Sequence, residues 1–107
     1  MPMFAPTEPV SALFDPAPSQ WGLRGDPYLW QAMQRALATV ARPSTAASLA
    51  ALIKSAFEQL TGHPIATNEP IYVPEYSHGG MSSGLVSPSF WREVAIPLLV
   101  ERWSERL

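Results

Sequence analysis

The clearest pattern of apolar and polar positions in this chain lies between residues 44 and 62. Its apolar residues recur at the three- and four-residue spacing of one helix face, and they are Leu49, Leu52, Ile53, Ala56, Phe57 and Leu60. Ser44 precedes the pattern and belongs to the residue types that cap helix N-termini. Gly62 follows it and favours the left-handed conformation that ends many helices. We therefore predict an amphipathic helix between Ser44 and Gly62.

A second helical pattern begins at Asp26. We predict this residue as the N-cap, because Pro27 follows it in the first helical position, where the missing N–H does no harm. The apolar residues then recur at helical spacing, as Leu29, Met33, Leu37 and Val40. Pro43 is expected to end this helix near Ala41.

The last predicted helix starts with Ser87 as its N-cap and Pro88 in the first helical position. Every residue from Val94 to Val100 is apolar, so we expect this helix to be buried on several sides. Pro97 removes one backbone hydrogen bond and is expected to kink the helix at Glu93–Val94.

A short hairpin is predicted between the second and last helices. The residues Ile71-Tyr72-Val73 favour a strand, but the flanking Pro70 and Pro74 restrict that strand to the edge of a sheet. Gly84-Leu85-Val86 are expected to pair back with it. Because an isolated hairpin is only marginally stable, this one must lie on the helices.

The N-terminal part of the chain is rich in proline. Residues 1–26 hold five prolines and cannot form a regular helix. We expect residues 1–12 to be loose, and the more apolar segment Leu13–Leu23 to form an extended arm packed on the body. The sequence thus predicts an α+β, predominantly helical fold: three helices around a kinked C-terminal helix, a short edge β-hairpin and an extended N-terminal arm. Residues 13–107 are predicted to form a single globular domain.

Composition narrows the classes of function. The net charge is −2 and the seven basic residues are dispersed, which disfavours nucleic acid as a partner. The chain has no cysteine, so disulfides, thiolate metal sites and cysteine nucleophiles are excluded. No secretory signal and no apolar run of about 18–20 residues is seen, so we expect a cytoplasmic protein without membrane contact. Six Arg against one Lys, with many Ala and Pro, is typical of a bacterial, GC-rich genome.

The polar, glycine-rich run Ser77–Gly84 is the most conspicuous candidate for chemistry. Within it, Gly80–Gly84 matches the G-x-S-x-G nucleophile elbow of α/β-hydrolases, and His78-Gly79-Gly80 is similar to an oxyanion loop. That fold places its acid and its histidine after the serine, whereas no Asp or His follows Ser82 here. The elbow interpretation is therefore disfavoured.

A local catalytic arrangement stays open as an alternative. In it His78 acts as the base for Ser82 or Ser83, and Glu75 orients the histidine. The competing interpretation is a flexible, solvated loop, because three glycines are costly to order.

Metal and cofactor sites are not predicted. The candidate ligands His63, Glu69, Glu75 and His78 lack ligand spacing on a helix. Lys54 is the only lysine and does not follow a phosphate-binding glycine motif.

Two hypotheses for function follow. The first is a small, non-catalytic protein-interaction module, such as an adaptor, a regulator or an immunity-type inhibitor, which binds another protein or itself. The second is a small ligand-binding protein or hydrolase-like enzyme that uses His78, Ser82 and Ser83. Aromatic residues near the ends of the elements favour the first, because exposed rings beside the glycine loop would form a groove for a partner. The candidate binding residues are Tyr72, Glu75, Tyr76, His78, Gly79, Gly80, Met81, Ser82, Ser83 and Trp91.

Overall fold

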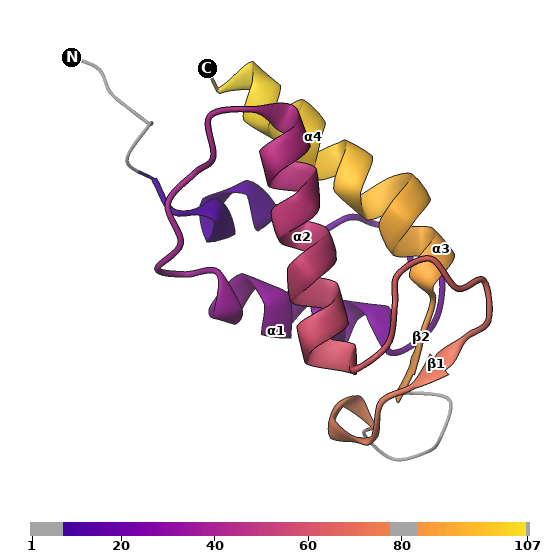
Figure 1. Ribbon diagram of the computed structural model, residues 1–107. Coiled ribbons are helices and arrows are strands. Elements are labelled where there is room, and N and C mark those ends of the chain that lie inside the picture. Colours follow the sequence, from indigo (N-terminus) through magenta and orange to yellow (C-terminus); the bar gives the residue numbers. More distant parts are fainter. Residues whose placement is uncertain (1–7, 78–83, 107) are drawn as a thin grey trace.

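The fold is seen in a computed structural model that describes residues 8–77 and 84–106 (Figure 1). Helices dominate, and β1 and β2 form a small antiparallel sheet at one end of them. In chain order the elements are the 3₁₀ helix η2 (Val10–Phe14), α1 (Asp26–Ala36), α2 (Ala46–Thr61), β1 (Ile71–Tyr72), the 3₁₀ helix η3 (Pro74–Tyr76), β2 (Leu85–Val86), α3 (Pro88–Phe90), the π-helical segment η5 (Trp91–Ala95) and α4 (Ile96–Glu105). The predicted class, a predominantly helical α+β fold, is confirmed.

Helix α2 follows its sequence pattern closely. It begins one residue later than predicted, because Thr45 rather than Ser44 is the N-cap, with Thr45 Oγ1 accepting a hydrogen bond from Ser48 N at 3.1 Å. At its other end Gly62 adopts the predicted left-handed conformation, with φ 73°. The side chains of Leu49, Ile53 and Phe57 on the predicted face are fully buried.

Helix α1 is shorter than predicted. It ends at Ala36 and not near Ala41, because the residues after it pair with the N-terminal segment. Val40 O accepts a hydrogen bond from Val10 N at 2.8 Å, and Pro9 and Ala41 form an isolated antiparallel bridge. A continued helix would have placed these backbone groups out of reach of their partners.

The N-terminal segment is less loose than predicted. Residues 1–7 lie outside the described residues, but the side chains of Val10, Leu13 and Phe14 in η2 are fully buried. The expectation of a loose segment up to residue 12 is therefore wrong for Val10–Ala12. This segment is held by residues far away in the sequence. Arg102 Nη1 donates a hydrogen bond to Leu13 O at 2.9 Å, and Arg106 Nη1 donates one to Ala12 O at 3.1 Å.

The C-terminal helix is irregular near the predicted place. Ser87 is the N-cap as predicted, with its side chain accepting from Phe90 N at 3.3 Å. Pro97 has no N–H and cannot donate a backbone hydrogen bond to Glu93 O. In the turn before it, Trp91–Ala95, the chain is π-helical, and Ile96 N donates a hydrogen bond to Trp91 O. Figure 1 shows α3, this segment and α4 as one continuous helix.

This helix packs mainly through one face. Its buried side chains recur every four residues, as Trp91, Ala95, Leu99 and Trp103. Val94 is 46% exposed, and Pro97 is exposed as well. The expectation of burial on several sides is therefore wrong, because the fully buried side chains lie on the one face that packs against α2 and η2. Among the helices that the structure describes, none is long and apolar enough to span a bilayer.

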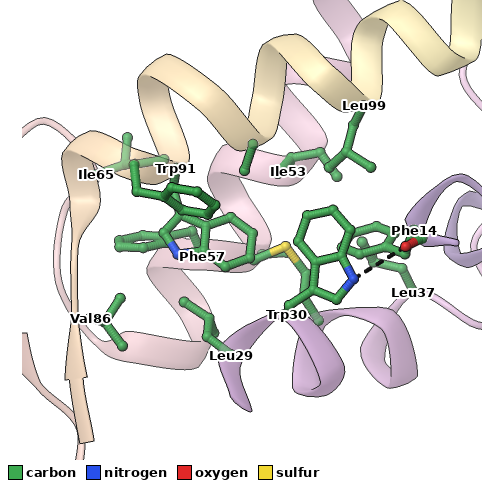
Figure 2. Packing of buried hydrophobic residues seen from close by; sticks show 14 of the residues in the cluster. Phe14, Leu29, Trp30, Leu37, Ile53, Phe57, Ile65, Val86, Trp91 and Leu99 are labelled. Atoms are coloured by element: carbon green, nitrogen blue, oxygen red, sulfur yellow. Dashed lines mark hydrogen bonds between the residues drawn. The ribbon is translucent and has the colours of Figure 1, made fainter. Parts of the chain in front are cut away.

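Aromatic side chains join these elements into one core (Figure 2). The Trp30 ring lies 4.7 Å from that of Phe14 and 5.9 Å from that of Trp91, between ring centroids. Trp91 also lies 6.1 Å from Phe57 of α2. The Trp30 indole N–H donates to Phe14 O at 3.2 Å, which satisfies its polar atom inside the core.

The hairpin has the predicted strands. Ile71 pairs with Val86 and Tyr72 with Leu85, and Val73 N donates to Gly84 O at 2.9 Å. On its other side, Leu85 O accepts a hydrogen bond from Gly25 N at 2.7 Å. The turn that precedes α1 is thus joined to β2 by its backbone.

Candidate functional site: the surface around Trp21

Of the candidate binding residues named from the sequence, the structure describes Tyr72, Glu75, Tyr76 and Trp91, and only two of these four are exposed. Tyr72 on β1 is 40% exposed, and Glu75 is exposed in η3. Tyr76 and Trp91 are buried, with 9% and 0% of their surface exposed. The remaining candidates lie outside the described residues, and they are His78, Gly79, Gly80, Met81, Ser82 and Ser83.

The prediction that Tyr76 and Trp91 are available to a partner is therefore wrong. Burial is the main cause that raises the pKa of the Tyr76 phenol, the Glu75 carboxylate raises it further, and Arg35 opposes both. Tyr76 is thus a neutral core residue at physiological pH. Trp91 lies in the ring cluster of the core, where its indole N–H donates to Asp26 Oδ1 at 3.1 Å.

Asp26 is the polar centre of the region where the turn before α1 meets β2 and α3. Its side chain is fully buried, and it accepts hydrogen bonds from Leu23 N at 2.7 Å, Ser87 N at 3.0 Å and Trp91 Nε1 at 3.1 Å. The predicted role as an N-cap is wrong, because Gly25 holds the N-cap position and no side chain caps α1. Two of these donors lie more than 60 residues away in the sequence, with separations of 61 and 65 residues.

Burial and hydrogen bonding act in opposite directions on the Asp26 carboxyl. Loss of solvent raises its pKa above the ordinary value, because burial disfavours the charged form. The hydrogen bonds from Ser87, Leu23, Trp91 and Gly22 lower it, but by less than burial raises it. A carboxyl group surrounded by N–H donors is therefore a structural connector between the turn, β2 and the last helix.

Two glycines allow this turn to approach its neighbours. A Cβ atom at Gly25 would lie 2.5 Å from Leu85 O, and one at Gly22 would lie 2.8 Å from the Cβ atoms of Phe90 and Ser87. Either contact is closer than side chains permit. The turn Trp21–Pro27 is thus fixed by backbone contact with β2 and by side-chain contact with α3.

Two hollows open on the surface of this turn and share Trp21 and Gly22. The first has a volume of about 290 Å³ and is lined by Gln20, Trp21, Gly22, Ser87, Ser89, Phe90, Glu93 and Val94. The second has a volume of about 460 Å³ and is lined by Trp21, Gly22, Leu23, Arg24, Pro27 and Leu85. We call the two hollows together the Trp21 surface. The Trp21 ring itself is half-buried, with its centroid 5.5 Å from that of Phe90 and 5.8 Å from that of Trp30.

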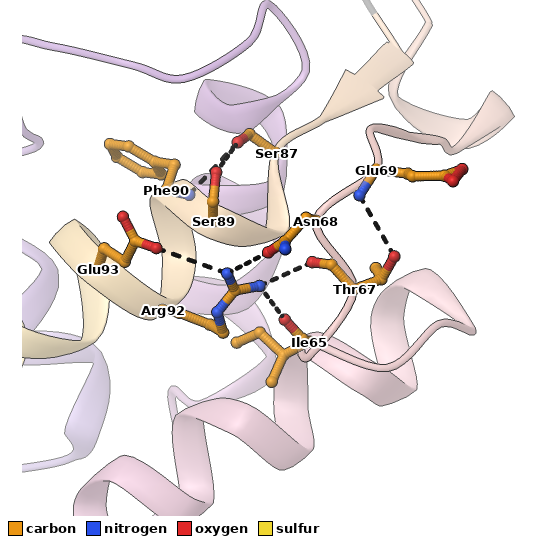
Figure 3. Close-up of polar contacts among 9 residues, drawn as sticks. All are labelled: Ile65, Thr67, Asn68, Glu69, Ser87, Ser89, Phe90, Arg92 and Glu93. Carbon is orange, nitrogen blue, oxygen red and sulfur yellow. Dashed lines mark hydrogen bonds and ion pairs between the residues drawn. The ribbon is translucent and has the colours of Figure 1, made fainter.

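Arg92, the neighbour of Glu93 in the sequence, makes several polar contacts (Figure 3). Its guanidinium donates to Ile65 O at 2.8 Å, Thr67 O at 2.7 Å and Asn68 Oδ1 at 2.6 Å. These bonds tie the π-helical segment to the connection that follows α2. The neighbouring Glu93 lies 3.5 Å from Arg92 as an ion pair, with 69% of its side chain exposed.

The described residues offer contact surface around Trp21. No three of their His, Asp or Glu side chains gather where they could hold a metal ion. The alternative catalytic arrangement, in which Glu75 orients His78 as the base for Ser82 or Ser83, remains a prediction. Its histidine and both serines lie outside the described ranges. The Trp21 surface supplies apolar side chains, the hydroxyl groups of Ser87 and Ser89, and the charged side chains of Glu93 in the first hollow and Arg24 in the second.

Sequence reasoning missed Trp21 and Val94 as surface residues. Trp21 was assigned to a packed arm, although the nearby Gly22 and Gly25 are a signal of close backbone approach. Val94 was assigned to the core because it lies in an all-apolar run, yet it is not on the four-residue repeat of buried positions. Comparison of the chain with protein-family models, curated protein sequences and solved structures gives no match.

Proposed function

We propose that this is a cytoplasmic, non-catalytic interaction module that binds a protein chain through the Trp21 surface. The observation that carries the proposal is a half-buried tryptophan between two adjoining hollows, with the exposed Val94 at their edge. Tryptophan is enriched among the residues that dominate binding energy, and such residues lie in pockets that exclude water. Val94 adds an apolar side chain that the core does not use.

The rigidity of the turn supports the same function. Asp26 and the close contacts of Gly22 and Gly25 fix the backbone that carries Trp21. A surface that is ordered before binding loses little conformational entropy when a partner arrives. The proposed module is therefore preorganised on its own side of the interface.

Affinity capture from the native source tests the proposal. The bait is the tagged full chain, compared with its Val94→Glu variant, which places a charge on the Trp21 surface at an exposed position. Tyr72→Ser is the matched control, because Tyr72 is also a large exposed apolar residue but lines neither hollow. We expect Val94→Glu to lower the amount of captured protein at least about tenfold, because binding would bury a charge that has no partner in the interface.

The control variant makes the result decisive. Tyr72→Ser should capture as much protein as the wild-type chain. If Tyr72→Ser abolishes capture and Val94→Glu does not, the binding surface lies at the hairpin and the proposal is wrong. Equal thermal melting temperatures of the three proteins would show that the effect of Val94→Glu is not due to unfolding.

A further inference from the structure

We propose that a hollow on another part of the surface binds a small aliphatic carboxylate, a molecule with an apolar chain and one anionic head. The hollow lies where α2, the connection that follows it and the last helix meet, and we call it the Lys54 hollow. Its volume of about 390 Å³ is in the range of small-molecule sites. This inference goes beyond the proposed function, because the Lys54 hollow shares no lining residue with the Trp21 surface.

The walls of the Lys54 hollow are apolar. Ala50 and Ala51 come from α2, Ile65 and Ala66 from the connection after it, and Ile96 from the last helix. Three of these five residues are alanines, whose short side chains leave space between the two helices. An aliphatic chain that enters this space is removed from water without losing a hydrogen bond.

The backbone at these walls has little to offer a peptide. Ile65 N donates to Glu58 Oε2 at 3.0 Å, and Ile65 O accepts from Arg92 Nη1 at 2.8 Å (Figure 3). The backbone groups of Ala50 and Ala51 are bonded within α2. A peptide in the hollow would lose water from its own N–H and C=O groups and find no partner among these, which is unfavourable. An aliphatic chain has no such groups, so the walls favour it.

The charge of the ligand follows from Lys54. Among the described residues that line the hollow, Lys54 and Arg92 are the charged ones, and both are cationic. The Arg92 guanidinium is engaged by three acceptors and by Glu93, whereas no hydrogen bond or ion pair joins Lys54 to another described residue. The Glu58 carboxylate, one turn further along α2, accepts from Ile65 N. The Lys54 ammonium group is therefore available to a carboxylate whose chain lies in the hollow, and a cationic amphiphile would be repelled.

Titration of the ¹⁵N-labelled full chain with octanoate, followed by ¹H–¹⁵N NMR spectra, tests the proposal. The amide signals of Ala50, Ala51 and Ala66 should shift saturably and give a dissociation constant. Octanoate should bind about four- to fifteenfold more tightly than hexanoate, because it has two more methylene groups to bury. Acetate lacks the chain and octylamine has the opposite charge, and each should bind at least about tenfold more weakly than octanoate.

Two pairs of variants test the head and the chain separately. Lys54→Glu should raise the dissociation constant of octanoate about tenfold, because repulsion replaces attraction. Its control is Gln59→Glu, which adds a negative charge at an exposed position of α2 outside the hollow and should leave the constant within about twofold. Ala51→Phe fills the hollow from an exposed position and should raise the constant at least about tenfold, whereas Ala47→Phe, at an exposed position outside the hollow, should not. Equal melting temperatures would show that all four variants are folded.

The outcomes decide the proposal and are independent of the proposed function. Octanoate binding that does not saturate up to about 10 mM overturns it, as does acetate or octylamine that binds as tightly as octanoate. Lys54→Glu or Ala51→Phe with the affinity of the wild-type chain overturns it as well, since binding is then adventitious. The Val94→Glu variant should bind octanoate like the wild-type chain, and Lys54→Glu should capture as much protein as the wild-type chain.

Discussion

Replacing Asp26 with alanine should be among the most damaging single changes in this protein. The substitution removes the acceptor of three N–H groups, the buried one of Trp91 and the partly buried ones of Leu23 and Ser87. Each buried donor that is left unsatisfied costs about 1–3 kcal/mol. Part of this is offset, because the variant no longer buries a carboxyl group whose ionised form is disfavoured. We therefore expect the free energy of unfolding to fall by about 3–5 kcal/mol.

Urea denaturation, followed by tryptophan fluorescence, measures this loss. Thr45→Ala is the matched control, because Thr45 is a true N-cap and its loss should cost only about 0.5–2 kcal/mol. Asp26→Ser should still cost more than about 2 kcal/mol, since one hydroxyl cannot serve donors on both sides of the carboxylate. A loss below about 1.5 kcal/mol for Asp26→Ala, or a silent Asp26→Ser, would show that the residue is an ordinary cap after all.

Three further predictions concern the same core and turn. Because the pKa of Asp26 in the folded chain lies above its ordinary value of 3.8, its protonation favours folding. The stability of the wild-type chain relative to Asp26→Asn should therefore be greatest below about pH 3.8 and should decrease as pH rises through the pKa of Asp26 in the folded chain. Urea melts of both proteins at a series of pH values measure this difference, and a difference that grows with pH would contradict the prediction. Leu99→Ala should lower the free energy of unfolding by about 2–5 kcal/mol, and Leu98→Ala should lower it clearly less, because Leu99 is fully buried and Leu98 only partly buried. Equal losses in urea melts would contradict the packing of the last helix through one face. Gly25→Ala should cost about 1–3 kcal/mol, since its Cβ would meet Leu85 O at 2.5 Å, and a thermal melt unchanged from wild type would refute that close approach.

Features with local causes could be predicted from the sequence. Helix α2 was located because its apolar spacing, its N-cap region and Gly62 all lie within the segment itself. The strand pairing of Ile71–Tyr72 with Leu85–Val86 was also predictable, because strand-forming residues flank a glycine-rich connection.

Features with distant causes could not be predicted. The pair Asp26-Pro27 has the pattern of a helix cap, and nothing near it indicates that Ser87 N and the Trp91 indole are its partners. Trp91 was predicted to be a binding residue because the sequence does not reveal whether the ring of an aromatic residue is covered by the core. The Trp21 surface depends on the meeting of two segments about 60 residues apart, so its residues could not be grouped in advance.

The bonds between η2 and α4 have a consequence for the order in which the chain can fold during synthesis. The acceptors Leu13 O and Ala12 O are made 89 and 94 residues before their donors, Arg102 and Arg106. At about 5–20 residues per second, a ribosome needs roughly 5 to 20 s to supply those donors. During that interval η2 has its contacts with α1 and the bond from Val10 N to Val40 O, but the apolar side chains of Val10, Leu13 and Phe14 lack the cover that α4 gives them. Completion of this fold is therefore a late event that follows translation of the last helix.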